Sequence, residues 1–146
     1  MRAVVQRVRE ASVTVDGAVT GSIGKGYLVL LGVGEGDTKA DADRIVKKLV
    51  NLRIFPDEND KINLSIQNVE GSLLVVSQFT LYADCRHGNR PSFTQAAKPD
   101  LAEELYEYFM EQCRETIPVV AHGVFGAHMD VRLWNDGPFT VILDSL

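Results

Sequence analysis

Apolar and polar residues alternate with the period of two that half-buried strands show over the first part of the chain. The alternation runs from Arg2 to Val15 and stops at Asp16-Gly17, a dipeptide typical of tight hairpin turns. A second strand is therefore expected to run back from Ala18 to Ile23. The pattern predicts a β-hairpin over residues 2–23.

Two short apolar runs predict strands that are buried in the sheet. They are Tyr27 to Leu31 and Gly71 to Ser77, and both are shorter than a typical buried helix. We expect both strands in the centre of a sheet. Weaker strand signals occupy Ile62 to Leu64, Val119 to Val124, Asp130 to Trp134 and Phe139 to Leu143.

Two segments change to the helical period, with apolar residues three and four positions apart. The first has Asp37 or Thr38 as its cap, and the second begins at Pro99-Asp100 and ends near Arg114. Their apolar positions are Ala42, Ile45, Val46, Leu49 and Leu52, and then Leu101, Leu105, Tyr108 and Phe109. Eight short strands, mostly with hairpin-length connections, favour an α+β or mainly β fold. We expect an antiparallel, barrel-like curved sheet with two amphipathic helices packed outside.

Length and composition fit one globular domain over residues 1–146, because 45% of the residues are hydrophobic. No apolar run approaches the roughly 18 residues that a membrane span needs, so we expect a cytoplasmic protein without membrane contact. Cys85 and Cys113 are too few for a disulfide framework. The net charge of -5 opposes a broad phosphate-binding surface, so any contact with nucleic acid must be local.

Two clusters suggest ligand sites but fit structural roles better. The glycine loop from Gly32 to Asp37 has a carboxylate where a dinucleotide-binding loop needs its third glycine. Asp84, Cys85 and His87 are metal-ligand types, but they lie in one loop without a second cluster. The prediction is therefore that the protein uses neither a metal nor a cofactor.

Polar residues follow directly on the second buried strand, where its pattern predicts further apolar ones. They are Ser77, Gln78 and Thr80, with the apolar Phe79 between Gln78 and Thr80. Their hydroxyl and amide groups either bond to neighbouring backbone as the strand leaves the core, or belong to a functional site. No histidine lies in a recognisable serine-hydrolase context such as G-x-S-x-G, so no general base is assigned. Gly137-Pro138, taken alone, is an ordinary turn.

Three motifs taken together resemble the D-aminoacyl-tRNA deacylases. They are Ser77 to Leu81, Gly88 to Phe93 and Asn135 to Thr140. The segments Met1 to Val8 and Phe125 to Met129 are similar to that family as well, so the match spans the chain. The resemblance implies an editing hydrolase that cleaves the ester of D-aminoacyl-tRNA, and of glycine mischarged on tRNA-Ala, releasing free amino acid and tRNA.

The resemblance also implies a homodimer with active sites at the subunit interface. Each site receives Gly137-Pro138, with a cis peptide bond, from the partner chain. Carbonyl oxygens held on one side can bind the α-ammonium of the substrate. An L side chain then strikes the Gly-Pro backbone, whereas a D side chain extends into open space. Arg7 is implied to hold this motif, and its alternative is an exposed strand arginine.

On the side of the site opposite Gly137-Pro138, the resemblance places Ser77, Gln78 and the Phe79 amide around the ester. They are implied to donate to the developing oxyanion, and Thr80 lies beside them. The ribose 2′-hydroxyl of the substrate is implied to assist, which fits the lack of an assignable base. The resemblance implies that Phe125, Gly126 and Met129 bind the terminal adenine of the tRNA. The alternative is that these residues only pack in the core.

Two other functions stay open at this point. A nucleic-acid-binding module without turnover would use Arg86, His87, Arg90 and Lys98, in and beside one loop, but the acidic composition opposes it. A generic small-molecule esterase would cleave simple D-amino acid esters as fast as the tRNA ester.

Overall fold

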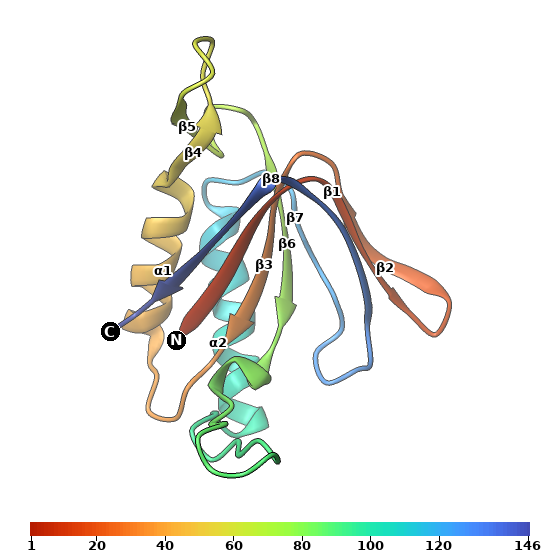
Figure 1. The fold of residues 1–146 in the computed structure, drawn as a ribbon, viewed down its shortest axis with the longest axis vertical. Coiled ribbons are helices and arrows are strands. Elements are labelled where there is room, and N and C mark those ends of the chain that lie inside the picture. Colours follow the sequence, from red (N-terminus) through yellow and green to blue (C-terminus); the bar gives the residue numbers. More distant parts are fainter.

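The computed structural model describes all 146 residues, and it contains eight strands, two α-helices and one short 3-10 helix (Figure 1). The elements in chain order are β1 (Arg2–Val15), β2 (Ala18–Ile23), β3 (Gly26–Gly32), α1 (Lys39–Asn51), β4 (Arg53–Pro56), β5 (Ile62–Ser65), β6 (Ser72–Ser77), η1 (Phe79–Tyr82), α2 (Pro99–Arg114), β7 (Val120–His122) and β8 (Asp130–Asp144). Both helices begin and end close to the residues that the helical period predicts.

Six strands form one curved sheet, in the order β2-β1-β3-β6-β7, with β8 paired to β1. One edge of β1 pairs first with β3 and then with β2, while its other edge pairs with β8 along most of its length. The sheet curves until β2 approaches β7. A Cβ placed on Gly21 of β2 would lie 2.4 Å from the carbonyl oxygen of His122 in β7. This close approach nearly closes the sheet into a barrel.

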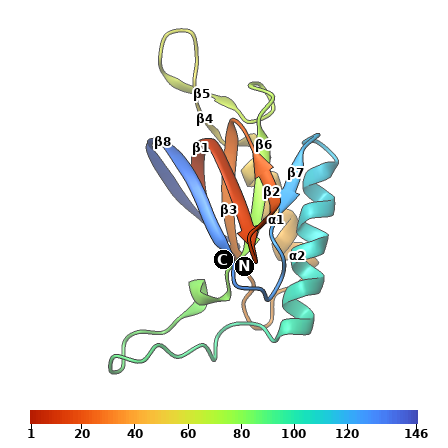
Figure 2. The ribbon, with the colours of Figure 1, turned by 90° about the vertical axis from the view of Figure 1, so that its right-hand side faces the viewer.

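The predicted fold class is confirmed, but its uniformly antiparallel pairing is wrong. β1 pairs antiparallel with β2, β3 and β8, whereas β3 with β6 and β6 with β7 pair parallel. Parallel neighbours need a long crossover connection, usually a helix. Here α1 lies between β3 and β6, and α2 lies between β6 and β7. The helices therefore pack side by side against one face of the sheet (Figure 2).

The last strand differs from the prediction of two segments separated by a turn. β8 is continuous from Asp130 to Asp144, and it pairs with β1 on both sides of a bulge. Gln6 pairs with Thr140 and Val8 with Asn135, so residues 136–139 of β8 lie opposite Arg7 alone. A bulge adds residues to one strand while the ladder continues beyond it. The predicted turn therefore protrudes from a strand and does not end it.

The core consists of two apolar clusters on the two faces of the sheet. The larger cluster lies under the helices, and the smaller one lies within the curve of the sheet. Representative members are Leu49, Phe109, Val5 and Val75 of the first, and Val13, Leu28 and Leu74 of the second. Neither helix has an apolar stretch long enough to span a bilayer.

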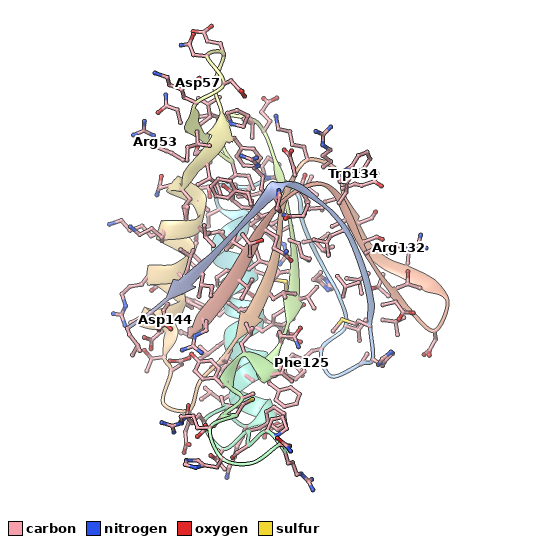
Figure 3. All side chains as sticks on the ribbon, viewed as in Figure 1. Arg53, Asp57, Phe125, Arg132, Trp134 and Asp144 are labelled. Atoms are coloured by element: carbon pink, nitrogen blue, oxygen red, sulfur yellow. The ribbon has the colours of Figure 1, made fainter.

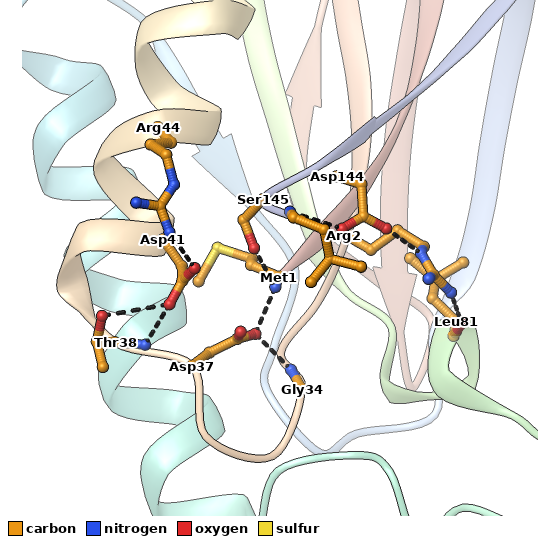
Figure 4. Close-up of polar contacts among 11 residues, drawn as sticks. Met1, Arg2, Gly34, Asp37, Thr38, Asp41, Arg44, Leu81, Asp144 and Ser145 are labelled. Atoms are coloured by element: carbon orange, nitrogen blue, oxygen red, sulfur yellow. Dashed lines mark hydrogen bonds and ion pairs between the residues drawn. The ribbon is translucent and has the colours of Figure 1, made fainter.

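The glycine loop after β3 is fixed by contacts within the protein (Figure 4). The carboxylate of Asp37 accepts a hydrogen bond from the Gly34 amide at 2.6 Å and pairs with the buried α-ammonium of Met1 at 2.6 Å. That ammonium also donates to Ser145 Oγ at 2.7 Å. These contacts give the loop a structural role. Thr38, the residue before α1, donates its amide to Asp41 at 2.8 Å and caps the helix.

Candidate active site

Residues 77–80 form the end of β6 and the turn that follows it. The amide of Gln78 donates to the Leu31 carbonyl oxygen of β3 at 2.8 Å, which is the last backbone bond before η1 begins. The Gln78 side chain donates to Thr80 Oγ1 at 2.5 Å. Ser77 and Gln78 are half-buried, whereas Phe79 and Thr80 are exposed. The strand therefore presents hydroxyl and amide groups to solvent at its carboxyl end.

The long loop between η1 and α2 folds back onto this turn. The Phe93 ring meets the Phe79 ring edge to face, with 5.0 Å between the ring centroids. Asp84 and Ser92 exchange two backbone hydrogen bonds of 2.7 and 2.9 Å, which close the base of the loop. Both rings are unusually exposed for phenylalanine, 55% for Phe79 and 38% for Phe93. The structure thus brings together two of the three motifs that the family resemblance rests on.

The third motif forms the bulge of β8. The Gly137-Pro138 peptide bond is cis, and both residues are exposed. Asn135 closes the bulge through its side chain. Its Nδ2 donates to the carbonyl oxygens of Arg7 at 2.9 Å and Phe139 at 3.1 Å, and its Oδ1 accepts the Phe139 amide at 3.2 Å. The exposed turn is therefore held at both ends by one amide side chain.

Arg7 supports the same turn from inside the protein. It is 8% exposed, so it is not a solvent-exposed strand arginine. Its Nε donates to the Asp136 carbonyl oxygen at 3.0 Å, and its Nη1 donates to the Ile54 carbonyl oxygen of β4 at 2.5 Å. The guanidinium also lies 4.8 Å from the centroid of the Phe139 ring. These contacts connect the turn to two other strands.

The two exposed features lie far apart within one chain. Ser77 pairs with Leu31, Leu31 with Ala3, and Ala3 with Leu143 of β8. Leu143 is six residues beyond Gly137. The Gly137-Pro138 turn therefore lies about 20 Å from Ser77 along the strand direction, and three strand spacings, about 14 Å, from it across the sheet. Figure 3 labels Trp134, just before the bulge, at the end of the sheet opposite η1. One chain therefore does not join them in a single pocket.

Phe125, Gly126 and Met129 lie in the loop between β7 and β8. The Phe125 ring packs at 5.8 Å from the Tyr106 ring of α2, against the larger core cluster. Met129 packs against the smaller cluster, and Gly126 is exposed with φ +78°. Phe125 lies toward the same end of the sheet as η1 (Figure 3). Both side chains are half-buried and contact core residues, and their role toward adenine stays a prediction.

Titratable groups at the end of η1 and in the loop after it differ in their protonation. Burial, together with the Asp37 carboxylate, raises the pKa of the Tyr82 phenol to about 12, so it stays protonated at neutral pH. Hydrogen bonds from Arg86 lower the pKa of Asp84 to about 2, so this carboxylate stays ionised. No cluster of three or more His, Cys, Asp or Glu side chains is arranged to hold a metal ion. The Asp84 carboxylate accepts hydrogen bonds from the Arg86 side chain of its own loop.

Two residues with clear contacts in these features belong to the family motifs but received no role from the sequence. Asn135 could have been suspected, because Asn before Asp-Gly commonly bonds to its own backbone in turns. Phe93 has no such local signal. Its contact with Phe79 depends on how a loop of more than ten residues folds, and no periodicity describes that.

The family model for D-Tyr-tRNA(Tyr) deacylase matches residues 4–144. A D-aminoacyl-tRNA deacylase of Clostridium acetobutylicum is 55% identical over 145 residues, which cover 99% of this chain and 97% of the relative. A protein of the same name from Thermosipho melanesiensis is 56% identical over 146 residues, with the same coverage.

Solved structures agree with the fold. A structure described as c-Myc DNA unwinding element binding protein is 44% identical, with a TM-score of 0.92 and coverage of 99% of this chain and 98% of that one. A probable eukaryotic D-amino acid tRNA deacylase, 21% identical with a TM-score of 0.83 and 98% coverage of both chains, bears on the fold alone. The family model and the curated relatives extend over nearly the whole chain, and the protein therefore belongs to the D-Tyr-tRNA(Tyr) deacylase family.

Proposed function

We propose that the protein hydrolyses the ester bond of D-aminoacyl-tRNA and releases the D-amino acid and tRNA. Membership of the deacylase family and the names of relatives at 55% identity support this activity. The observation that carries the proposal is a pair of exposed, separately braced features. One is the polar carboxyl end of β6, and the other is the Gly137-Pro138 turn, which Arg7 and Asn135 hold.

A homodimer is the arrangement that joins these two features. They lie at opposite ends of the sheet, so a two-fold partner can place its turn against residues 77–80 of the first chain, and the reverse. Ile142, which pairs with Val4, is 66% exposed on the strand that carries the turn. An exposed apolar side chain of this size on a sheet face is consistent with a covered surface in the assembly.

Residues 77–80 form the side of the site at which the ester reacts, called the reaction wall below. Ser77, Gln78 and the Phe79 amide donate to the ester carbonyl oxygen as negative charge develops on it. Thr80 lies beside them and accepts from Gln78. An aminoacyl ester is already activated, so positioning and oxyanion stabilisation suffice, with the ribose 2′-hydroxyl assisting. Phe125, Gly126 and Met129 hold the terminal adenine.

Gly137 and Pro138 supply the chiral filter. Their carbonyl oxygens bind the α-ammonium of the substrate, which fixes the chiral centre against a braced backbone. An L side chain then collides with that backbone, while D side chains and glycine are accepted. Because Arg7 and Asn135 leave the turn little freedom to move aside, the filter rejects L substrates without contacting the side chain it accepts.

The activity is tested with D-Tyr-tRNA and L-Tyr-tRNA under single-turnover conditions. Hydrolysis of the D ester with retention of the L ester is expected, and equal hydrolysis of both, or of neither, contradicts the proposal. Thr80→Ala should keep substantial activity, because Thr80 is a neighbour and not the nucleophile. A trapped acyl-enzyme would contradict this assignment. Simple D-amino acid esters cleaved as fast as the tRNA ester would indicate a generic esterase.

Shared sites are tested by mixing two inactive chains. Gln78→Ala disables the reaction wall, and Pro138→Ala displaces the carbonyl oxygens that bind the α-ammonium, so substrate is no longer held. In a heterodimer with shared sites, one of the two sites receives both intact walls, so activity returns. If each chain used its own two walls, both sites of the heterodimer would remain defective. Recovery of activity on co-expression therefore supports the shared site, and its absence in a purified heterodimer contradicts it.

Nucleic-acid binding without turnover is a second candidate function. The solved relative at 44% identity is described as a DNA unwinding element binding protein, and this description favours it. The net charge of -5 opposes it, since phosphate binding needs a basic surface. Tight, salt-dependent binding of duplex DNA by a protein inactive on D-Tyr-tRNA would support this candidate over the deacylase.

A further inference from the structure

Arg2 connects the end of β8 to the turn that carries Phe79 and Thr80. Its Nη1 donates to the Leu81 carbonyl oxygen at 3.0 Å, and its Nε donates to Asp144 Oδ2 at 3.0 Å (Figure 4). Its guanidinium also lies 5.0 Å from the centroid of the Tyr82 ring. Leu81 and Tyr82 are the last two residues of η1. One side chain thus contacts both residues that end the turn.

The end of η1 packs against Gly32 and Gly34 but has few other hydrogen bonds. The turn is only four residues long, and carbonyl groups at the end of so short a helix lack partners within it. Ala83 donates its amide to the Thr80 carbonyl oxygen at 3.0 Å, and Arg2 donates to the next carbonyl oxygen. At the start of the turn, the Gln78 amide is bound to β3. Arg2 therefore supplies a hydrogen bond at the end of η1, as β3 does at its start.

The Tyr82 ring is enclosed between Arg2 and the loop after β3. A Cβ placed on Gly34 would lie only 2.8 Å from this ring, so the backbone of the loop is already in close contact with it. The guanidinium lies over the ring. Asp144 in turn orients Arg2, because its carboxylate accepts from Arg2 and from the Leu146 amide at 3.1 Å. The order of support is thus Asp144, Arg2 and then η1.

We infer that Arg2 is a positioning residue, which holds η1 so that the Phe79 amide keeps the geometry needed at the reaction wall. This inference rests on the proposed function of residues 77–80. Arg2 and Asp144 are both about one-third exposed, at 35% and 30%. Ion pairs this exposed add little to global stability. The loss of Arg2 therefore acts on the position of the turn and not on the fold.

The test compares Arg2→Ala with wild type on D-Tyr-tRNA. A small displacement of reacting groups lowers the rate of chemistry strongly, so kcat should fall about 10- to 100-fold. KM and the ratio of D to L hydrolysis should not change, because the filter and the adenine residues are untouched. Amide hydrogen exchange at Ala83 should become faster. Arg2→Lys should recover part of kcat, since one ammonium reaches Leu81 or Asp144 but does not span both.

Arg44→Ala is the matched control. Arg44 forms the same kind of pair, with Asp41 at 2.6 Å, in the region drawn in Figure 4, and its interactions lie within α1. The kcat of Arg44→Ala should equal that of wild type. The inference is overturned if Arg2→Ala keeps kcat within about twofold of Arg44→Ala, or if its loss of activity matches a loss of folded protein by circular dichroism.

A further variant separates this inference from the proposed function. If Gln78→Ala is inactive while Arg2→Ala is fully active, the site stands and the role of Arg2 is wrong. If Gln78→Ala is as active as wild type, residues 77–80 are not the reaction wall, and the positioning role fails with them.

Discussion

Arg7 donates a hydrogen bond from Nε to the carbonyl oxygen of Asp136, 3.0 Å away, directly before the Gly137-Pro138 turn. The same guanidinium donates to the Ile54 carbonyl oxygen, so the turn is braced against β4 as well as β1. β4 belongs to a separate two-stranded sheet that projects from the molecule (Figure 1). A buried side chain thus joins segments that are far apart in the sequence.

Arg7→Lys should destabilise the protein and weaken its discrimination against L substrates. A lysine ammonium does not span both carbonyl oxygens, and leaving a buried acceptor unpaired costs about 1–3 kcal/mol. Urea unfolding measures the loss, and the ratio of D to L hydrolysis measures the filter. Arg9→Lys is the control, because Arg9 pairs with the same Asp136 at 3.6 Å but is 62% exposed. Equal effects of the two substitutions would contradict the bracing role.

Gly137→Ala should disrupt the turn more than an alanine at another glycine with positive φ. Gly137 has φ +142°, and a Cβ on it would lie 2.8 Å from the Phe139 amide nitrogen. Gly36 also has a positive φ, +85°, but open space around it. Gly36→Ala should cost about 1 kcal/mol of unfolding free energy, and Gly137→Ala about 2 kcal/mol or more. Unfolding curves of comparable midpoint for both variants would refute the steric argument.

Tyr27→Phe should leave the protein as stable as wild type, or more stable. The Tyr27 hydroxyl is fully buried and has no hydrogen-bond partner, while its ring stacks on Phe55 at 5.1 Å. Removing it relieves a desolvation cost of about 1 kcal/mol and keeps the ring packing. Tyr106→Phe is the matched comparison, because the buried Tyr106 hydroxyl donates to the Val75 carbonyl oxygen at 3.2 Å. It should lower the melting temperature. A Tyr27→Phe variant that melts as far below wild type as Tyr106→Phe would contradict this prediction.

Asp41→Ala should destabilise the start of α1 by about 1 kcal/mol, in a manner that depends on pH. The Thr38 amide, with help from Arg44, lowers the pKa of Asp41 from 3.8, against the effect of burial. The stability from this carboxylate is therefore complete above pH 3.8 and is lost as the pH falls through the lower folded pKa. The difference in unfolding free energy between variant and wild type should be constant from pH 5 to 7. It should shrink as the medium becomes more acidic, and urea unfolding at each pH measures it.

The strongest local patterns predicted the elements correctly. The alternation of β1, the apolar runs of β3 and β6 and the helical period of α1 and α2 all depend on which side of an element faces the core. Periodicity records this directly. Strand direction is not recorded in this way, because a parallel and an antiparallel strand bury the same residues. The parallel pairing of β6 was therefore missed.

The candidate site was predicted only as residues, and not as an arrangement. Polar groups after β6 and the turn at Gly137 were visible in the sequence, and the family resemblance connected them. Their roles in catalysis and chiral selection stay predictions. The bulge opposite Arg7 was read as a break between two strands, since residues 136–139 carry turn signals while the pairing that continues beyond them depends on β1.

The sequence by itself determined the family, the helices, the central strands and the residues that form the two exposed features, because local patterns and motifs carry that information. Only the tertiary structure decided which backbone groups Arg7 and Arg2 bind, that Asn135 closes the bulge, and that the two features lie at opposite ends of the sheet. Such relationships join residues up to 142 positions apart, as for Arg2 and Asp144. They follow from strand register and curvature, to which the whole chain contributes.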